Sequence, residues 1–115
     1  MTVQDEATMN IFELRVYTLR DQQSLDFYKD QVYPRHLRSA AQFNITVRGI
    51  WTSPEEAAHR LYVLVSHPEG TDLAAVEQAY MQSPEFLSDV RGLDPSSIVD
   101  VTSVRLEATA ASPLR

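Results

Sequence analysis

Alternating and periodic apolar positions predict four strands and two helical regions along this chain. From Ile11 to Leu19 the residues alternate between two faces, as they do in a β-strand. The next apolar residues, over 24–43, recur at steps of three and four, which is the spacing of a helix. Pro34 lies inside this helix and predicts a bend, because proline removes a backbone hydrogen bond and clashes with the preceding turn.

The second half of the chain supplies the remaining elements. Thr46–Thr52 and Arg60–Ser66 have the composition of two strands joined by a polar loop, and Ile98–Leu106 has that of a fourth. Asp72 and Ser83 are expected N-caps of two short helical stretches between the third and fourth strands. The order β-α-β-β-α-β predicts a ferredoxin-like α+β fold, in which an antiparallel four-stranded sheet carries its helices on one face.

We expect one domain over residues 10–107, flanked by a flexible N-terminus (1–9) and a C-terminal tail (108–115). A chain of 115 residues, of which 43% are hydrophobic, suits a single core. It has no apolar run long enough to cross a membrane, no secretion signal at its start and no cysteine. These features together favour a cytoplasmic protein.

Both faces of the predicted sheet are apolar, although two helices can cover only one of them. Leu61–Val65 is apolar without interruption, and each of the other three strands contains two adjacent apolar residues. A bare second face would be a larger apolar patch than soluble monomers usually expose. We therefore expect an obligate homodimer in which two sheets pack face to face.

The net charge changes the list of possible partners. The formal charge is -6, and the ten basic residues form no cluster in the sequence. A protein that binds nucleic acid or an acidic membrane surface needs a basic face to neutralise phosphates. We therefore expect neither nucleic acid nor a membrane as a partner.

Several segments resemble the NIPSNAP family. The opening Phe12–Leu19 (FELRVYTL) is similar to the start of its members, and Gly49–Thr52 (GIWT), Tyr62–Leu64 and Ser83–Phe86 are also similar. The resemblance spans residues 10–106 and implies a dimeric α+β barrel, the fold and the dimer expected from the pattern. That superfamily includes cofactor-independent monooxygenases, haem-degrading enzymes, isomerases and polyketide cyclases, so the resemblance by itself transfers no catalytic residue.

His36 is the principal candidate for chemistry. It lies in the apolar stripe of the long helix, where a polar side chain needs a reason, and imidazole can act as a general acid or base near neutral pH. Arg38, or alternatively Arg35, could hold an oxyanion with its guanidinium fork. The alternatives are a buried histidine that bonds a backbone carbonyl and two solvated surface arginines.

Aromatic residues from several elements are expected either to line a pocket for a flat apolar ligand or to form an aromatic core. The expected ligand-binding residues are Tyr17, Tyr33, Trp51, Tyr62, Tyr80 and Phe86. Glu13 and Arg15 share one face of the first strand. We expect them to pair across the dimer rather than to take part in catalysis.

These features predict a homodimer that binds an aromatic or polyketide-like small molecule and performs cofactor-independent chemistry on it. The expected reaction is a cyclisation, isomerisation, dehydration or oxygenation in which His36 moves a proton. Two alternatives stay open: a non-catalytic binding or interaction module, and a haem-handling protein. No metal is expected, because His36, His59 and His67 lack metal-ligand spacing, and no cofactor motif is present.

Overall fold

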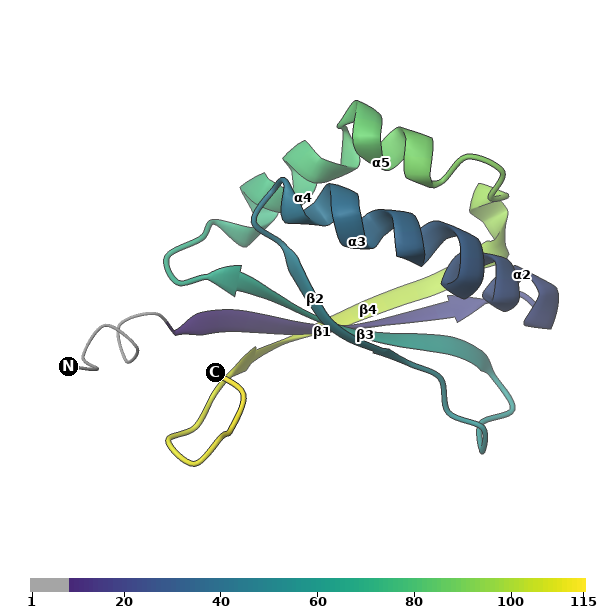
Figure 1. The fold of residues 1–115 in the computed structure, drawn as a ribbon. Helices are drawn as coiled ribbons and strands as arrows, with labels where there is room; N and C mark the ends of the chain where they lie inside the picture. Colours follow the sequence, from purple (N-terminus) through teal and green to yellow (C-terminus); the bar gives the residue numbers. More distant parts are fainter. Residues whose placement is uncertain (1–8) are drawn as a thin grey trace.

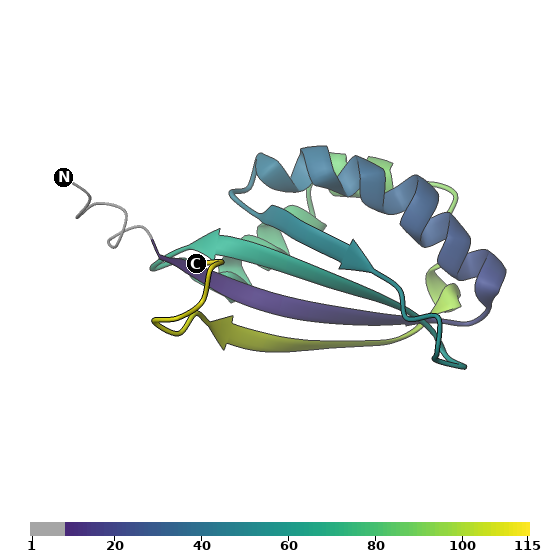
Figure 2. The same ribbon diagram turned by 60° about the horizontal axis from the view of Figure 1, so that its bottom comes forward.

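A computed structural model describes residues 9–115, in which a layer of helices covers one face of a four-stranded antiparallel sheet (Figures 1 and 2). The strands lie side by side in the order β2-β3-β1-β4. Their bounds are Asn10–Leu19 (β1), Thr46–Trp51 (β2), His59–Pro68 (β3) and Ile98–Glu107 (β4). The helices are Gln22–Phe27 (α2), Tyr33–Ala41 (α3), Leu73–Met81 (α4) and Pro84–Asp89 (α5), with a π-helical turn at Tyr28–Val32 and a short 3-10 turn at Pro95–Ser97.

The predicted α+β class and the order of the elements are confirmed. Asp72 and Ser83 cap α4 and α5 as expected, each accepting a backbone N–H with its side-chain oxygen. The expected flexible N-terminus lies outside the described residues, except for Met9. At the other end of the chain the tail folds back, and Asn10 Nδ2 donates to the carbonyl of Arg115 over 2.8 Å.

The bend expected at Pro34 takes the form of a π-helical turn immediately before it. Pro34 has no N–H to donate to the preceding turn, and the wider π turn accommodates its ring. Within this turn the N–H of Tyr33 bonds the carbonyl of Tyr28, five residues earlier. Tyr28 and Tyr33 therefore lie on the same face of the helix, with their ring centroids 5.4 Å apart.

His67 is a strand residue, although the predicted third strand ends one position earlier, at Ser66. β3 continues through Pro68, because His67 pairs with Ile11 and Pro68 with Asn10 in the antiparallel ladder. His67 faces the helices and is only 1% exposed. The turn begins one residue after Pro68.

Helices and sheet bury one core between them, and none of the helices within 9–115 has the length and apolar character needed to span a bilayer. Leu61, Val63 and Val65 of β3 point into this core, as alternation along a strand requires. They contact residues of the long bent helix and the loop that follows it. The fully buried members from that region include Val32, Ala40 and Ile45.

The opposite face of the sheet is apolar and open to solvent. Leu14 pairs with Leu64 on one side and with Val104 on the other, so that an apolar row crosses three strands. The side chain of Val104 is 55% exposed and that of Trp51 is 54% exposed. The second apolar face that the sequence pattern predicted is therefore present.

Gly49 on β2 allows Trp51 to lie flat against the sheet. The ladder between β2 and β3 shifts register between Val47 and Gly49, as expected for a glycine within a strand. A Cβ atom at Gly49 would lie 2.1 Å from a ring carbon of Trp51. The glycine is thus needed for close approach of the indole.

Replacing Gly49 by Ala should displace the Trp51 indole and lower the unfolding free energy by about 1 kcal/mol, within the cost of inserting a methyl group into a packed site. Trp51 is the only tryptophan, so its emission should shift to the red in the same variant. Denaturant titration measures the first effect and fluorescence the second. In a Trp51→Ala background the Gly49→Ala substitution should leave the unfolding free energy unchanged. An equal loss of unfolding free energy in both backgrounds would show that the contact with the indole does not cause the loss.

Candidate functional site

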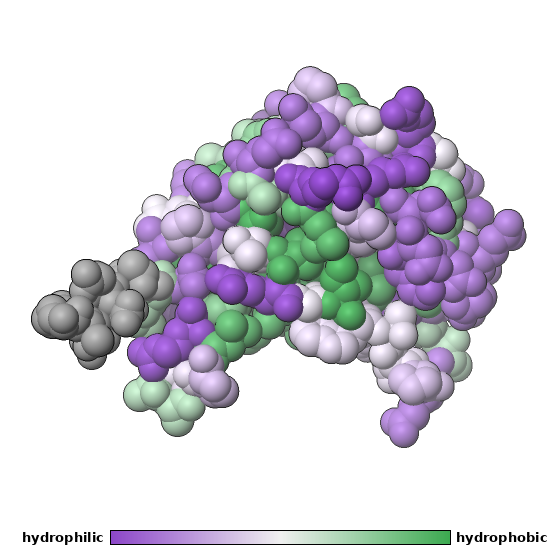
Figure 3. Space-filling model, viewed as in Figure 1, coloured by the Kyte–Doolittle hydropathy of each residue, from purple (hydrophilic) through white to green (hydrophobic). Residues whose placement is uncertain are grey.

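A cavity of about 350 Å³ lies between the helix layer and the helix-facing side of the sheet. Its lining is mostly apolar and aromatic and comes from every strand, from α3, α4 and α5, and from the π-helical turn. Polar groups enter it from Arg15, His36, Glu77 and several tyrosines. Figure 3 shows a patch of apolar side chains in the middle of the viewed face, with more polar surfaces around it. An apolar cavity with few polar groups is typical of a small-molecule site.

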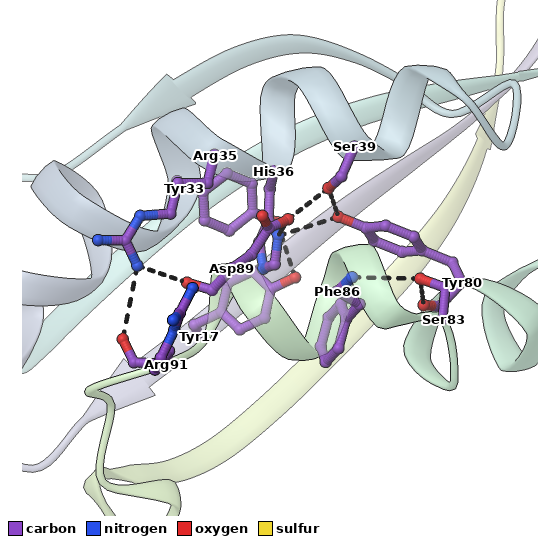
Figure 4. Close-up of polar contacts among 10 residues, drawn as sticks. All are labelled: Tyr17, Tyr33, Arg35, His36, Ser39, Tyr80, Ser83, Phe86, Asp89 and Arg91. Atoms are coloured by element: carbon purple, nitrogen blue, oxygen red, sulfur yellow. Dashed lines mark hydrogen bonds and ion pairs between the residues drawn. The ribbon is translucent and has the colours of Figure 1, made fainter.

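His36 of α3 lies in the wall of this cavity and is held by a buried network (Figure 4). Its Nδ1 atom is 2.8 Å from Asp89 Oδ2 and 2.9 Å from the hydroxyl of Tyr80. Ser39 bonds the same carboxylate oxygen and also lies 2.7 Å from the Tyr80 hydroxyl. All four side chains belong to buried residues, so the network joins α3, α4 and α5 away from water.

The partners of this network determine which nitrogen of His36 carries its hydrogen. An ionised carboxylate only accepts hydrogen bonds, so Nδ1 of His36 and Oγ of Ser39 both donate to Asp89. The Tyr80 hydroxyl then donates to Ser39. The Tyr80 oxygen accepts a share of the Nδ1 hydrogen over 2.9 Å, and Nε2 of His36 keeps its lone pair and has no partner among the described residues. This is the state of a general base.

The surroundings keep His36 neutral near physiological pH. Burial lowers the pKa of His36, and hydrogen bonding to Asp89 together with its charge offsets this only in part. The His36 ring stacks on Phe86, with centroids 5.1 Å apart and planes 12° apart. Burial raises the pKa of Tyr80 to about 12, so its hydroxyl stays protonated.

A tyrosine cluster occupies the part of the cavity next to His36. The rings of Tyr17, Tyr28 and Tyr33 pack edge to face, with centroids 5.1 to 5.8 Å apart. The hydroxyls of Tyr17 and Tyr33 lie 2.9 Å apart, and one donates to the other. The pair holds two hydrogens and uses one, so the second is available to a ligand oxygen.

Arg15 of β1 lies at another edge of the cavity, between two carboxylates. Its guanidinium is 3.0 Å from Glu13 Oε1 and 2.6 Å from Glu77 Oε2 of α4. His67 Nε2 lies 3.1 Å from Glu13, whereas the buried Nδ1 of His67 has no partner among the described residues. The hydrogen bond from His67 and the charge of Arg15 lower the pKa of Glu13 to about 2.

Most of the residues predicted from the sequence as site residues line this cavity. The helix-facing strand positions and the inward face of the bent helix bring them together. They are Tyr17, Tyr33, His36, Tyr80 and Phe86.

Three predicted site residues lie elsewhere. Arg38 follows His36 by two positions, which turns it to the far side of the helix, into an open groove between α3 and α5. Tyr62 lies between the inward-facing Leu61 and Val63, so alternation directs it to the helix-free face, where its hydroxyl donates to Glu56 over 2.6 Å. Trp51 pairs with Tyr62 in the ladder and shares that face.

Several residues of the site were not predicted from the sequence, namely Arg15, Tyr28, Ser39, Glu77 and Asp89. Asp89 follows Phe86 by three positions, a spacing that places both on the same face of a helix. Leu87, which directly follows Phe86, is 59% exposed. Arg15 follows the alternation of Tyr17 and therefore faces the cavity, and it pairs with Glu77 of the same chain. Alternation along the strand could therefore have predicted that Arg15 faces the cavity.

The side chains do not form a metal site in the part of the chain that the structure describes: no group of three or more His, Asp or Glu residues is suitably placed. Ser39 is not arranged as a nucleophile, because it bonds Asp89 rather than His36. The geometry instead provides one free imidazole nitrogen, a spare hydroxyl hydrogen and a buried guanidinium around an apolar cavity.

Comparisons with known proteins identify the fold. A NIPSNAP family protein of unknown function from Agrobacterium tumefaciens matches with a TM-score of 0.73 and 17% identity, over 93% of this chain and 95% of that one. An uncharacterised NIPSNAP domain protein from Burkholderia xenovorans matches with a TM-score of 0.67 and 19% identity, over 90% and 98%. The fold is therefore that of NIPSNAP proteins of known structure, as the resemblance implied.

A third structure extends this likeness. A candidate antibiotic biosynthesis monooxygenase from Nitrosomonas europaea matches with a TM-score of 0.61 and 11% identity, over 89% of this chain and 93% of that one. No protein-family model matches the sequence, and no curated protein matches it. At these identities the comparisons establish the fold alone.

Replacing Glu13 by Gln should lower the unfolding free energy at neutral pH by up to about 3 kcal/mol, the equivalent of its pKa shift. The ordinary pKa of 4.5 falls to about 2 in the folded protein. The unfolded chain thus takes up the proton first, so this stabilisation is complete above pH 4.5 and disappears as the pH falls to 2. Urea titrations across this range should give a shallower pH dependence for the variant.

Glu69→Gln serves as the control for this measurement, since Glu69 is exposed and forms no ion pair within residues 9–115. It should leave the acid dependence unchanged. An unchanged pH slope in Glu13→Gln would show that the Glu13–His67 pair does not stabilise the fold.

Proposed function

We propose that this protein binds a small aromatic or polyketide-like molecule in the cavity and catalyses a cofactor-independent reaction that begins with proton transfer to His36. The observation that carries the proposal is the free Nε2 of an imidazole fixed by Asp89 at the wall of an aromatic cavity. Its lowered pKa leaves this nitrogen unprotonated at neutral pH. A positioned neutral histidine of this kind is suited to general base catalysis.

The first step follows from the polar groups around the cavity. Nε2 of His36 takes a proton from a carbon next to a carbonyl group, the electron pair of the broken C–H bond forms a carbon–carbon double bond, and the carbonyl π electrons move to oxygen. The spare hydroxyl hydrogen of the Tyr17–Tyr33 pair can then bond the resulting oxyanion. Isomerisation, cyclisation or dehydration can proceed from this enolate, and oxygenation requires dioxygen as a second substrate.

The structural comparisons are compatible with this proposal. The similar NIPSNAP proteins have no stated activity, and the Nitrosomonas europaea protein is described as a candidate monooxygenase of antibiotic biosynthesis. The alternative is a module that binds a ligand in the same cavity without turnover. A measurement of proton transfer distinguishes the two functions.

We also propose that the protein acts as a homodimer whose subunits pack through the helix-free faces of their sheets. The apolar row formed by Leu64, Leu14 and Val104 supports this arrangement, as do Trp51 and Leu106 on the same face. A second copy offers the same row and would cover it. A contiguous apolar surface of this kind is typical of an interface rather than of a free surface.

Replacing His36 by Gln should reduce the rate of enolisation by a hundredfold or more, the usual contribution of a positioned base. Benzoylacetone, an uncharged aromatic diketone, is a suitable probe, because its enol is followed by ultraviolet absorption. The wild-type rate should persist below pH 6.5 and fall as the pH drops through the lowered pKa of His36, since only the neutral ring accepts a proton.

His59→Gln is the matched control, because His59 lies at the start of β3 and outside the cavity. It should retain the wild-type rate. Binding of benzoylacetone without any acceleration of enolisation in the wild-type protein would contradict catalysis and favour the binding module.

Replacing Val104 by Lys should convert the proposed dimer into monomers at micromolar concentration. The substitution places a charge at one end of the apolar row, on β4, where burial against a second copy would leave it unpaired. Sedimentation velocity measures the change. Leu87→Lys is the control, since Leu87 is equally exposed but lies on α5, on the other side of the sheet; a monomeric wild-type protein would contradict the proposal.

A further inference from the structure

The positive charge of Arg15 is fully neutralised before any ligand arrives. Arg15 is the only lysine or arginine in the wall of the cavity, as far as residues 9–115 define it. Two carboxylates face its guanidinium, Glu13 at 3.0 Å and Glu77 at 2.6 Å. Around this group negative charge therefore exceeds positive charge by one.

The neighbouring charged residues do not reverse this balance. His67 bonds Glu13, and even in its protonated form two cations would face two carboxylates. Asp89 contributes a further negative charge behind His36. Arg105 lies opposite Glu13 in the ladder, but it is exposed and is not part of the cavity wall.

We infer that the cavity selects an uncharged carbonyl compound and that Glu77 is the residue that determines this selectivity. A carboxylate ligand would bring a further negative charge to an already neutralised guanidinium, and water screens the repulsion only in part because the Arg15 side chain is 12% exposed. A ketone oxygen needs only a hydrogen-bond donor, and the Tyr17–Tyr33 pair has one available. The inference rests on the proposed function, in which such a ketone becomes an enolate.

Glu77 differs from Glu13 in a way that makes it the residue to test. The side chain of Glu77 is 43% exposed, on α4, whereas that of Glu13 is 11% exposed and also bonds His67. Removing the charge of Glu77 leaves Arg15 paired with Glu13 and leaves no carboxylate stranded. The charge balance of the cavity can thus be changed while its core stays intact.

Acetophenone and benzoate are suitable probes, because they have the same number of non-hydrogen atoms and differ in charge. In ligand-observed NMR titrations at neutral pH, the wild-type protein should bind acetophenone at least about tenfold more tightly than benzoate, as expected for one unfavourable charge contact. Glu77→Gln should tighten benzoate binding by about tenfold and leave acetophenone within about twofold. Glu77→Ala should change benzoate binding in the same direction.

Glu85→Gln is the matched control, since Glu85 lies on α5 and faces the open groove between α3 and α5 rather than the cavity. It should leave both affinities unchanged. Equal binding of the two probes to the wild-type protein, no binding of acetophenone, or no gain for benzoate in Glu77→Gln would overturn the inference.

The result that would contradict the proposed function differs from the one that would contradict this inference. If acetophenone is preferred but benzoylacetone enolises no faster with protein than without it, the charge selectivity stands and the catalytic role of His36 does not. If enolisation depends on His36 but benzoate binds as tightly as acetophenone, catalysis stands and the selectivity does not.

Discussion

The buried carboxylate of Asp89 is the constraint on which the arrangement of the helices depends. A carboxylate removed from water is tolerated only when donors surround it, and here the donors are His36 and Ser39 of α3, with Tyr80 of α4 completing the network. Asp89 also fixes Arg35 through its backbone carbonyl over 2.9 Å. Three helices are thereby joined over the cavity, and the ring of His36 receives its orientation from the same contacts.

A second constraint acts within the chain, at Pro34. Because this residue cannot donate a hydrogen bond, the preceding turn widens into a π-helix, and Tyr28 and Tyr33 come to lie on one face. Tyr33 then reaches Tyr17 on the sheet, and its ring lies edge-on to that of His36 at 5.1 Å. The irregular turn thus brings the tyrosine hydroxyls and the imidazole to the same side of the cavity.

The strand β1 contributes to two surfaces at once. Its odd-numbered residues Glu13, Arg15 and Tyr17 face the helices; Arg15 and Tyr17 line the cavity, and Glu13 pairs with Arg15. Its even-numbered residues face the opposite side and include the centre of the exposed apolar row, Leu14. A substitution at an odd-numbered position of β1 therefore affects the helix-covered side, and one at an even-numbered position affects the helix-free face.

The sequence by itself determined the class of fold, the order of the elements, the capping residues and the presence of a second apolar face. These properties follow from local spacing, which repeats every two residues in a strand and every 3.6 in a helix. It also singled out His36, since a polar group within an apolar stripe is visible without coordinates. Tyr17, Tyr33, Tyr80 and Phe86 were predicted as members of an aromatic set, whereas Tyr28, which also lines the cavity, was not.

Only the tertiary structure decided which face of the sheet the helices cover, and with it which residues share the cavity. Because the helices cover that face, Trp51 and Tyr62 lie outside the cavity and Arg15 lies in its wall. The pairing of His36 with Asp89 joins residues 53 positions apart, and no local spacing encodes such a contact. Periodicity states which side chains point the same way along one element, whereas a site depends on how separate elements pack, and that is determined by the burial of the whole chain.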